Sequence, residues 1–258
     1  MNILFIGDIV GRAGRRAVRI FLDEIKEEHN IDFIISNGEN SAGGFGITKK
    51  VAEELYNYGI DFFTMGNHTW DNRDIFNFID DDPNLIRPLN FPENNPGRGW
   101  QTLEINSKKI TIVNLIGQVY MQSHDSPYHK FMELYPKIKD SDIILVDFHA
   151  EATGEKIAFA RAVDGMVTAV IGTHTHVQTN DAQIFPKGTA YITDAGLTGA
   201  VDSILGIKPE KMVEKMKTSL PVSYEVGTGD VKIEGVIIKI DDNNDSAQEI
   251  MEIQKNNL

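Results

Sequence analysis

The sequence predicts a layered α/β fold, and two observations carry this prediction. Short apolar runs alternate with amphipathic stretches over much of the chain, as in Ile3–Ile6 followed by Arg12–Glu28. Polar residues that can bind metals also stand directly at the ends of several apolar runs. Alternating strands and helices favour a sheet covered by helices. In such sheets, ligands bind at the carboxyl ends of the strands.

The first part of the chain alternates regularly between strand and helix patterns. The expected strands are Ile3–Ile6, Phe33–Ser36 and Asp61–Met65, and the expected helices are Arg12–Glu28, Thr48–Tyr58 and Asp74–Ile79. Apolar residues recur along one side of the first helix, and Thr48 can cap the second with its side-chain oxygen. These segments therefore predict three consecutive strand–helix units.

The middle of the chain changes character before the alternation resumes. Asp80–Arg98 is rich in Pro and Asn and is predicted as a loop, which together with Met121–Pro127 could shape a pocket. The remaining expected elements are a hairpin of Gln101–Ile105 and Lys109–Leu115, strands at Ile143–Phe148, Val167–Ile171, Ala190–Thr193 and Val231–Ile240, and a helix at Glu155–Val163. Asp245–Lys255 is expected to form a short helix or a fraying tail.

Composition restricts the class of protein. The 258 residues, 41% of them hydrophobic, fit a single domain spanning 1–258, and no segment is apolar enough for a membrane span or a signal peptide. The chain has no Cys, which excludes thiolate metal sites and fits a cytoplasmic location. The net charge of −13 argues against a broad nucleic-acid-binding face. A small anionic substrate is still compatible, because bound cations invert the local charge.

The candidate metal ligands follow the expected strands. They are Asp8, Glu39, Asn40, Asn67, His149, His174 and His176, with His68 next to Asn67. In extended chain, His174 and His176 point to the same side and could reach neighbouring ions. Plainer interpretations are a helix cap for Asp8, a polar turn for Glu39 and Asn40, and a buried structural pair for the two histidines. The other histidines, His29, His124 and His129, are expected at the surface.

As a set, these motifs resemble the calcineurin-like metallophosphoesterase superfamily over residues 1 to about 200. Two departures narrow the resemblance. The usual Asp-x-His is Asp8-Ile9-Val10 here, and Glu39 followed by Asn40 replaces the usual bridging Asp. Both changes are similar to the bacterial YmdB-like branch, as are Asp147–Thr153 and Thr193–Gly196. The resemblance implies a four-layer α/β/β/α sandwich with two mixed sheets, and phosphodiesterase activity toward cyclic nucleotides, 2′,3′-cyclic and also 3′,5′-cyclic ones.

The resemblance also implies how two metal ions would be held. The first ion would bind Asp8, Glu39, Asn40 and His176, and the second would bind Glu39, Asn67, His149 and His174. Glu39 would bridge the ions, a bridging hydroxide would attack phosphorus, and His68 would donate a proton to the leaving oxygen. Iron is expected, while Mn or Zn would also suit these nitrogen and oxygen ligands.

Several alternatives stay open. The same site could serve a phosphomonoesterase, or the chain could be a regulatory metalloprotein with low turnover. A purely structural metal site fits less well, because such sites are usually closed and hold one ion. Arg12, Arg15 and Arg16 could attract a phosphate at a helix N-terminus, although a solvated basic helix face is favoured. A homo-oligomer is compatible with the sequence, and the partner expected otherwise is a small phosphodiester.

Overall fold

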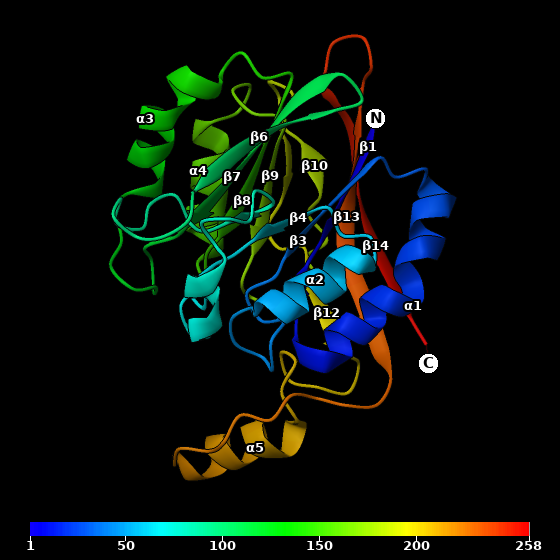
Figure 1. Cartoon of the computed structure of the whole chain (residues 1–258), viewed down its shortest axis with the longest axis vertical. Helices are drawn as coiled ribbons and strands as arrows, with labels where there is room; N and C mark the ends of the chain where they lie inside the picture. Colours follow the sequence, from blue (N-terminus) through cyan, green and yellow to red (C-terminus); the bar gives the residue numbers. More distant parts are fainter. Residues whose placement is uncertain (258) are drawn as a thin grey trace.

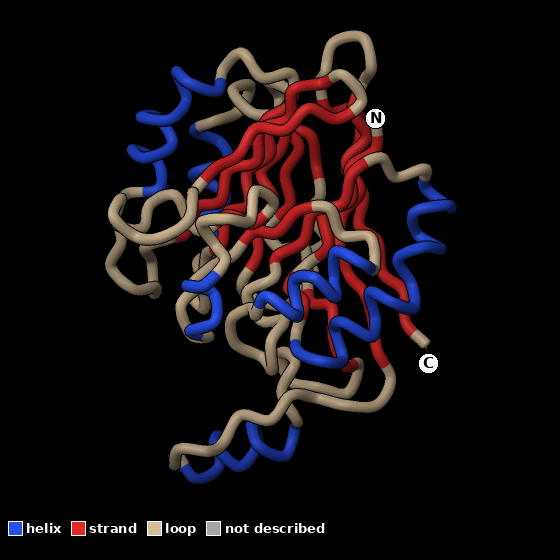
Figure 2. Tube along the Cα trace, in the orientation of Figure 1, coloured by secondary structure: helices blue, strands red, loops and turns tan. Residues whose placement is uncertain are grey.

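The computed structural model describes residues 1–257, and its two β-sheets pack face to face with helices on their outer faces (Figures 1 and 2). One sheet contains β1 (Asn2–Ile6), β2 (Asp8–Ile9), β3 (Phe33–Asn37), β4 (Phe62–Thr64), β5 (Leu85–Ile86), β12 (Leu197–Ala200), β13 (Val231–Ile240) and β14 (Ala247–Asn256). The other contains β6 (Trp100–Ile105), β7 (Lys108–Ile116), β8 (Ile143–His149), β9 (Ala169–Thr173), β10 (Gln183–Ile184) and β11 (Ala190–Ile192).

Both sheets combine parallel and antiparallel pairs. In the first sheet β1 pairs with β3 in parallel and with β13 antiparallel; in the second, β8 is parallel to β7 while β6 and β7 form the predicted hairpin. The first sheet is covered by α1 (Gly11–His29) and α2 (Lys49–Asn57), and the second by α3 (Pro127–Ile138) and α4 (Thr153–Ala162). The predicted four-layer sandwich with two mixed sheets is thus confirmed.

The apolar core explains why the strands are continuous hydrophobic runs. Along β1, Ile3 and Phe5 pack into the cluster between the sheets, whereas Leu4 and Ile6 pack into the cluster beneath α1. A strand buried on both faces needs apolar residues at every position. The polar residues that follow such a strand are then delivered to the edge of the sheet.

The C-terminal segment corrects one prediction. Instead of a short helix or a tail, residues 247–256 form β14, which pairs antiparallel with β13 along its length. The buried side chains of Ala247, Ile250 and Ile253 recur every three residues, a spacing that also fits a helix. Pairing with β13, with a register shift between Lys239 and Ile240, outweighs that local preference.

Other differences concern short or interrupted elements. The expected helix Asp74–Ile79 is a 3₁₀ helix, η1, at Arg73–Asn77, and the loop Asp80–Arg98 contains β5. Two helices were not predicted from the sequence: α3, which begins at Pro127 and contains an internal proline, and α5 (Pro209–Thr218). Within residues 1–257, every helix is too short or too polar to cross a membrane.

Helix α5 lies on a long connection between β12 and β13 that we call the 201–230 excursion. Its two arms run side by side, with backbone N–H···O distances of 2.8 Å from Val201 to Asp230, from Lys208 to Glu225 and from Gly227 to Gly206. Helix α5 extends away from both sheets, and none of its residues is buried (Figure 1). The excursion is therefore held by the backbone hydrogen bonds between its two arms, while α5 lies beyond them.

Candidate metal centre

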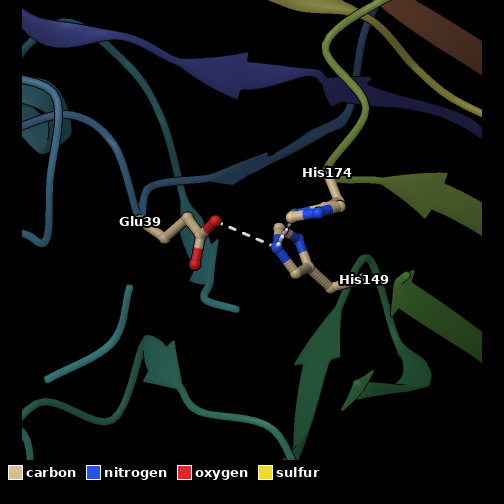
Figure 3. Close-up of side chains that lie close together, drawn as sticks. All are labelled: Glu39, His149 and His174. Atoms are coloured by element: carbon tan, nitrogen blue, oxygen red, sulfur yellow. Dashed lines mark hydrogen bonds and ion pairs between the residues drawn. The ribbon is translucent and has the colours of Figure 1, made fainter. Parts of the chain in front are cut away.

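The side chains of Glu39, His149 and His174 meet between the two sheets, each arriving from the end of a strand (Figure 3). The Nε2 atom of His149 lies 2.9 Å from Oε1 of Glu39 and 3.1 Å from Nδ1 of His174. It also lies 2.9 Å from Oδ1 of Asn67, which follows β4. One imidazole nitrogen therefore faces three other potential metal ligands.

A second group of candidate ligands lies next to the first. The Nε2 atom of His176 lies 3.7 Å from Oδ1 of Asp8 and 3.2 Å from the amide nitrogen of Asn40. That amide nitrogen is also 3.5 Å from Oε1 of Glu39, so Glu39 contacts both groups. The structure thus brings together all seven residues that the sequence singled out as ligands.

The contacts fit bound cations better than a closed hydrogen-bond network. Oδ1 of Asp8 is buried and has no hydrogen-bond partner among the described residues. Buried polar atoms are rarely left in this state. Nε2 of His149 and Nδ1 of His174 face each other. If a single proton lies between these two nitrogens, the side-chain oxygens of Asn67 and Glu39 have no proton to accept from Nε2 of His149. A cation accepts the lone pairs of all these atoms at once.

Each candidate histidine is oriented by a hydrogen bond from its other ring nitrogen. Nδ1 of His149 is 2.9 Å from the hydroxyl of Thr173, which donates to Asp147 at 2.7 Å. Nε2 of His174 is 3.1 Å from Oε2 of Glu151. Such partners fix the imidazole tautomer and direct the free nitrogen toward a metal.

His176 is oriented by backbone rather than by a side chain. Its Nδ1 lies 3.1 Å from the carbonyl oxygen of Leu205, on the 201–230 excursion. His174 and His176 both have left-handed backbones, with φ of 97° and 62°. Residues other than glycine seldom adopt this conformation, and it tends to persist where surrounding contacts enforce it.

His68 lies beside these groups and is held by different contacts. Its backbone N–H donates to Oε2 of Glu39 at 2.7 Å, and its Nδ1 is 2.7 Å from Oδ2 of Asp71. Because Nδ1 of His68 contacts Asp71, Nε2 is the ring nitrogen that is available to a ligand in the cavity that His68 lines. Asp71 carried no signal in the sequence, since it is one of several polar residues in a turn.

Comparisons with known proteins identify the family to which the chain belongs. The model of the YmdB-like protein family matches residues 4–253. This chain belongs to the YmdB-like family. A 2′,3′-cyclic-nucleotide 2′-phosphodiesterase of Bacillus subtilis (strain 168) is 48% identical over 254 residues, which cover 98% of this chain and 96% of that protein. Putative phosphatases/phosphodiesterases of Mycoplasma genitalium and Mycoplasma pneumoniae are 37% and 38% identical, covering 93% and 94% of this chain and 88% and 89% of theirs.

Solved structures extend the comparison. The crystal structure of a novel phosphatase from Mycoplasma pneumoniae has a TM-score of 0.95 and 35% identity, covering 99% of this chain and 93% of that one. The calcineurin-like phosphoesterase YfkN from Bacillus subtilis has a TM-score of 0.63 at 12% identity, covering 99% and 90%, and shows the shared fold. The predicted resemblance to the YmdB-like branch and the prediction of a phosphoester hydrolase are confirmed.

The electrostatics of this YmdB-like centre follow from burial and from close partners. Burial acts to raise the pKa of Glu39, but His149 and His68 outweigh it and hold that pKa below its usual range. Burial acts to lower the pKa of His149, and Glu39 outweighs it and raises that pKa. Burial and the neighbouring His149 lower the pKa of His174 to about 3, so its imidazole is neutral and keeps a lone pair.

Two further features of the centre were missed in the sequence. Gly66 leaves room for the ligands, because a Cβ there would lie 2.3 Å from Nε2 of His149 and 2.6 Å from Oε2 of Glu39. Below the histidines, fully buried Lys156 donates to Oδ2 of Asp194 at 3.0 Å, and the same oxygen accepts the backbone N–H of Thr175 at 3.0 Å. This ion pair holds the segment between His174 and His176.

The remaining predicted residues have structural roles or lie apart. Arg15 donates to Glu54 and to the carbonyl of Ser41, and Arg16 donates to the carbonyl of Gly229, so both tie loops to α1. Of the three arginines, Arg12 is exposed and the other two are half-buried. His129 is exposed as predicted. His29 and His124 are half-buried, which corrects the expectation of surface residues.

His124 packs against Phe91 at a ring-centroid distance of 4.8 Å. Both line a cavity of about 520 Å³ together with Asn67. The two loops expected to shape a pocket, Asp80–Arg98 and Met121–Pro127, both contribute to this cavity.

Proposed function

We propose that this chain is a phosphodiesterase with two metal ions that hydrolyses 2′,3′-cyclic nucleotides, with 3′,5′-cyclic nucleotides as further substrates. The observation that carries the proposal is the contact of Glu39 with two adjoining groups of ligands. One group is Asp8, Asn40 and His176, and the other is Asn67, His149 and His174. A relative that shares 48% of its residues is named a 2′,3′-cyclic-nucleotide 2′-phosphodiesterase, which supports the choice of substrate.

The donor atoms support a definite assignment of ligands. Oδ1 of Asp8, Nε2 of His176 and Asn40 would hold the first ion with Glu39, while Oδ1 of Asn67, Nε2 of His149 and Nδ1 of His174 would hold the second with Glu39. Asn40 would bind through Oδ1, which a half-turn of its amide brings to the position of the nitrogen. Nitrogen and oxygen donors suit iron, and Mn or Zn would be accepted as well.

The chain's own residues supply binding and proton transfer. Bound divalent ions lower the pKa of a coordinated water and stabilise charge on the phosphoryl oxygens. His68, held by Asp71, donates the Nε2 proton to the ribose oxygen as its bond to phosphorus breaks. General acid catalysis of this kind contributes about 10²–10⁴-fold.

The charge of the site favours an anionic substrate despite the net charge of −13. Asp8 and Glu39 are the only carboxylates in the proposed ligand set, and they do not neutralise two divalent ions. Glu151 lies beside His174 and is half-exposed, so its charge is partly screened. The phosphodiester is therefore attracted locally.

The decisive experiment combines elemental analysis with a substrate panel. We expect two metal ions per chain and hydrolysis of 2′,3′-cyclic AMP. His68→Ala should keep both metals and lose about 10²–10⁴-fold in kcat, whereas His129→Ala, an exposed control, should match the wild type. One metal per chain would contradict the two-ion site, and full activity of His68→Ala would remove His68 from the mechanism.

A phosphomonoesterase is the second candidate, because the Mycoplasma relatives are named putative phosphatase/phosphodiesterase. Comparing kcat/KM for bis-p-nitrophenyl phosphate and p-nitrophenyl phosphate separates the two. A diesterase prefers the first compound. If neither compound nor any cyclic nucleotide is hydrolysed by the metal-loaded protein, a regulatory metalloprotein with low turnover replaces both.

A further inference from the structure

The cavity at the candidate metal centre is lined by two chemically different sets of residues. Its volume is about 510 Å³. The polar set contains Glu39, Asn40, His68, Glu151, His174 and His176. The apolar set contains Val10, Phe45, Ile204, Leu205, Met212 and Tyr224. Such a lining suits a ligand that combines a charged group with a flat or apolar body.

A row of aromatic contacts joins the polar set to the apolar set. The ring of Phe45 meets that of His68 edge-to-face at 5.0 Å, and the ring of Tyr224 meets Phe45 at 5.9 Å in the same manner. Tyr224 is 45% exposed and Leu205 47% exposed, although both are large apolar residues. Apolar surface left open beside a polar centre commonly marks a binding site.

The position of this row relative to the metal centre is fixed by close packing. Val226, two residues after Tyr224, packs so tightly on Gly11 and Gly44 that a Cβ on either glycine would lie 2.8 or 3.1 Å from its methyl groups. Gly44 precedes Phe45 directly. On the outer side, the ammonium group of Lys215 contacts the Tyr224 hydroxyl and lies 5.0 Å from the centre of its ring.

We propose that Phe45 and Tyr224 form a stacking shelf that binds the nucleobase of the substrate. The proposal rests on the proposed function, because it takes the metal centre as the place of the phosphate. Phe45 and Tyr224 offer a base the faces and edges of their rings. The hydroxyl of Tyr224 already contacts Lys215, so it does not serve to distinguish one base from another. Stacking on aromatic side chains accepts every base, since each has a π-face. The substrates are therefore nucleoside cyclic phosphates with little preference among bases.

The test compares 2′,3′-cyclic AMP with the 2′,3′-cyclic phosphate of methyl riboside, which has no base. One base–aromatic contact corresponds to about 5- to 140-fold in kcat/KM. We expect the wild type to favour the nucleotide by this factor and Tyr224→Ala to lose most of that preference. Tyr224→Phe, which keeps the ring, should retain it. Tyr128→Ala, at an exposed tyrosine on α3 that is not among the cavity-lining residues, is the control.

Two outcomes overturn the shelf. One is a wild type that hydrolyses both compounds equally well, and the other is a Tyr224→Ala variant that keeps the preference. If the wild type hydrolyses neither compound, the proposed function fails, and the shelf is judged by binding of adenosine 3′-monophosphate to the Mn-loaded protein. Weaker binding by Tyr224→Ala, with normal binding by Tyr224→Phe, supports it; equal binding by all three proteins overturns it. Thermal melting of each variant confirms that it is folded.

Discussion

Nδ1 of His176 lies 3.1 Å from the carbonyl oxygen of Leu205, and this contact joins a candidate metal ligand to the 201–230 excursion. Leu205 has a left-handed backbone with φ of 52°. A β-branched residue is strongly disfavoured in this conformation, whereas glycine adopts it freely. The position of the carbonyl therefore depends on which residue stands at 205.

The first prediction follows from that dependence. Leu205→Val should displace the carbonyl and weaken metal binding by about tenfold, in keeping with the loss of other groups that orient ligands. Leu205→Gly should bind metal as the wild type does. Titration of the metal-free protein with Mn, followed by elemental analysis, measures both. Equal affinity of the valine variant would show that the contact does not orient His176.

Glu151 gives a second prediction, because it orients His174 from outside the ligand set. Glu151→Gln removes the charge that faces Nε2 of His174, and we expect metal affinity to fall about 10- to 100-fold. The matched control is Glu104→Gln, an exposed carboxylate on β6. The same metal titration decides the matter, and an unchanged affinity in Glu151→Gln would exclude the orienting role.

Gly66 gives a third prediction, because its missing side chain leaves space for the ligands. Gly66→Ala would place a Cβ 2.3 Å from His149, so we expect a loss of bound metal in a chain that still folds. Gly154→Ala, in the first turn of α4, meets no atom within 4 Å and should be neutral or stabilising by up to about 1 kcal/mol. Normal metal content in Gly66→Ala would contradict the packing argument.

The buried pair of Lys156 and Asp194 gives a fourth prediction, which concerns stability. Lys156→Met should lower the free energy of unfolding by about 3–5 kcal/mol, because Asp194 stays buried without its partner. Lys239→Met, which breaks an exposed pair with Glu249, should cost less than about 1 kcal/mol. Urea denaturation measures both. Equal losses would show that burial does not distinguish the two pairs.

The fifth prediction concerns high pH. Burial, together with Asp82, raises the pKa of Tyr56, whose hydroxyl donates to both oxygens of that carboxylate at 3.0 and 3.1 Å. A raised pKa in the folded state means that the folded protein holds the proton longer, so the stabilisation is complete below pH about 10 and declines above it. Unfolding of Tyr56→Phe should depend less on pH in this range; identical profiles would contradict the linkage.

The residue pattern predicted a layered α/β fold and the meeting of the candidate ligands for one physical reason, whereas the four-layer sandwich was implied by the family resemblance. Strands buried on both faces are continuous apolar runs, so the polar residues that follow them stand out, as Asp8 and His149 do. The contacts that orient these residues carry no such signal. Leu205 acts through its backbone, and Asp71 is an ordinary turn residue. The roles of the individual ligands, like the single domain, stay predictions.

Elements whose pattern is ambiguous were the ones missed. The apolar residues of β14 recur every three positions, and only pairing with β13 decides that it is a strand. Helix α5 buries none of its residues, so no core-facing stripe marks it in the sequence. Pairing with β13 determines the first case, and the lack of a buried face on α5 explains the second.

The sandwich and the 201–230 excursion contribute different residues to the cavity. Strand ends of the sandwich deliver the proposed ligands, whereas the excursion contributes Tyr224 to the lining of the cavity. Under the proposed base-binding role of Tyr224, substitutions beyond Leu205 change the preferred substrate and leave the proposed ligands in place. Deletion of the whole excursion would have a different effect, because His176 would lose its contact with the carbonyl oxygen of Leu205. We therefore expect the sequence of the 201–230 excursion to tolerate change, whereas the loss of the whole excursion is not tolerated.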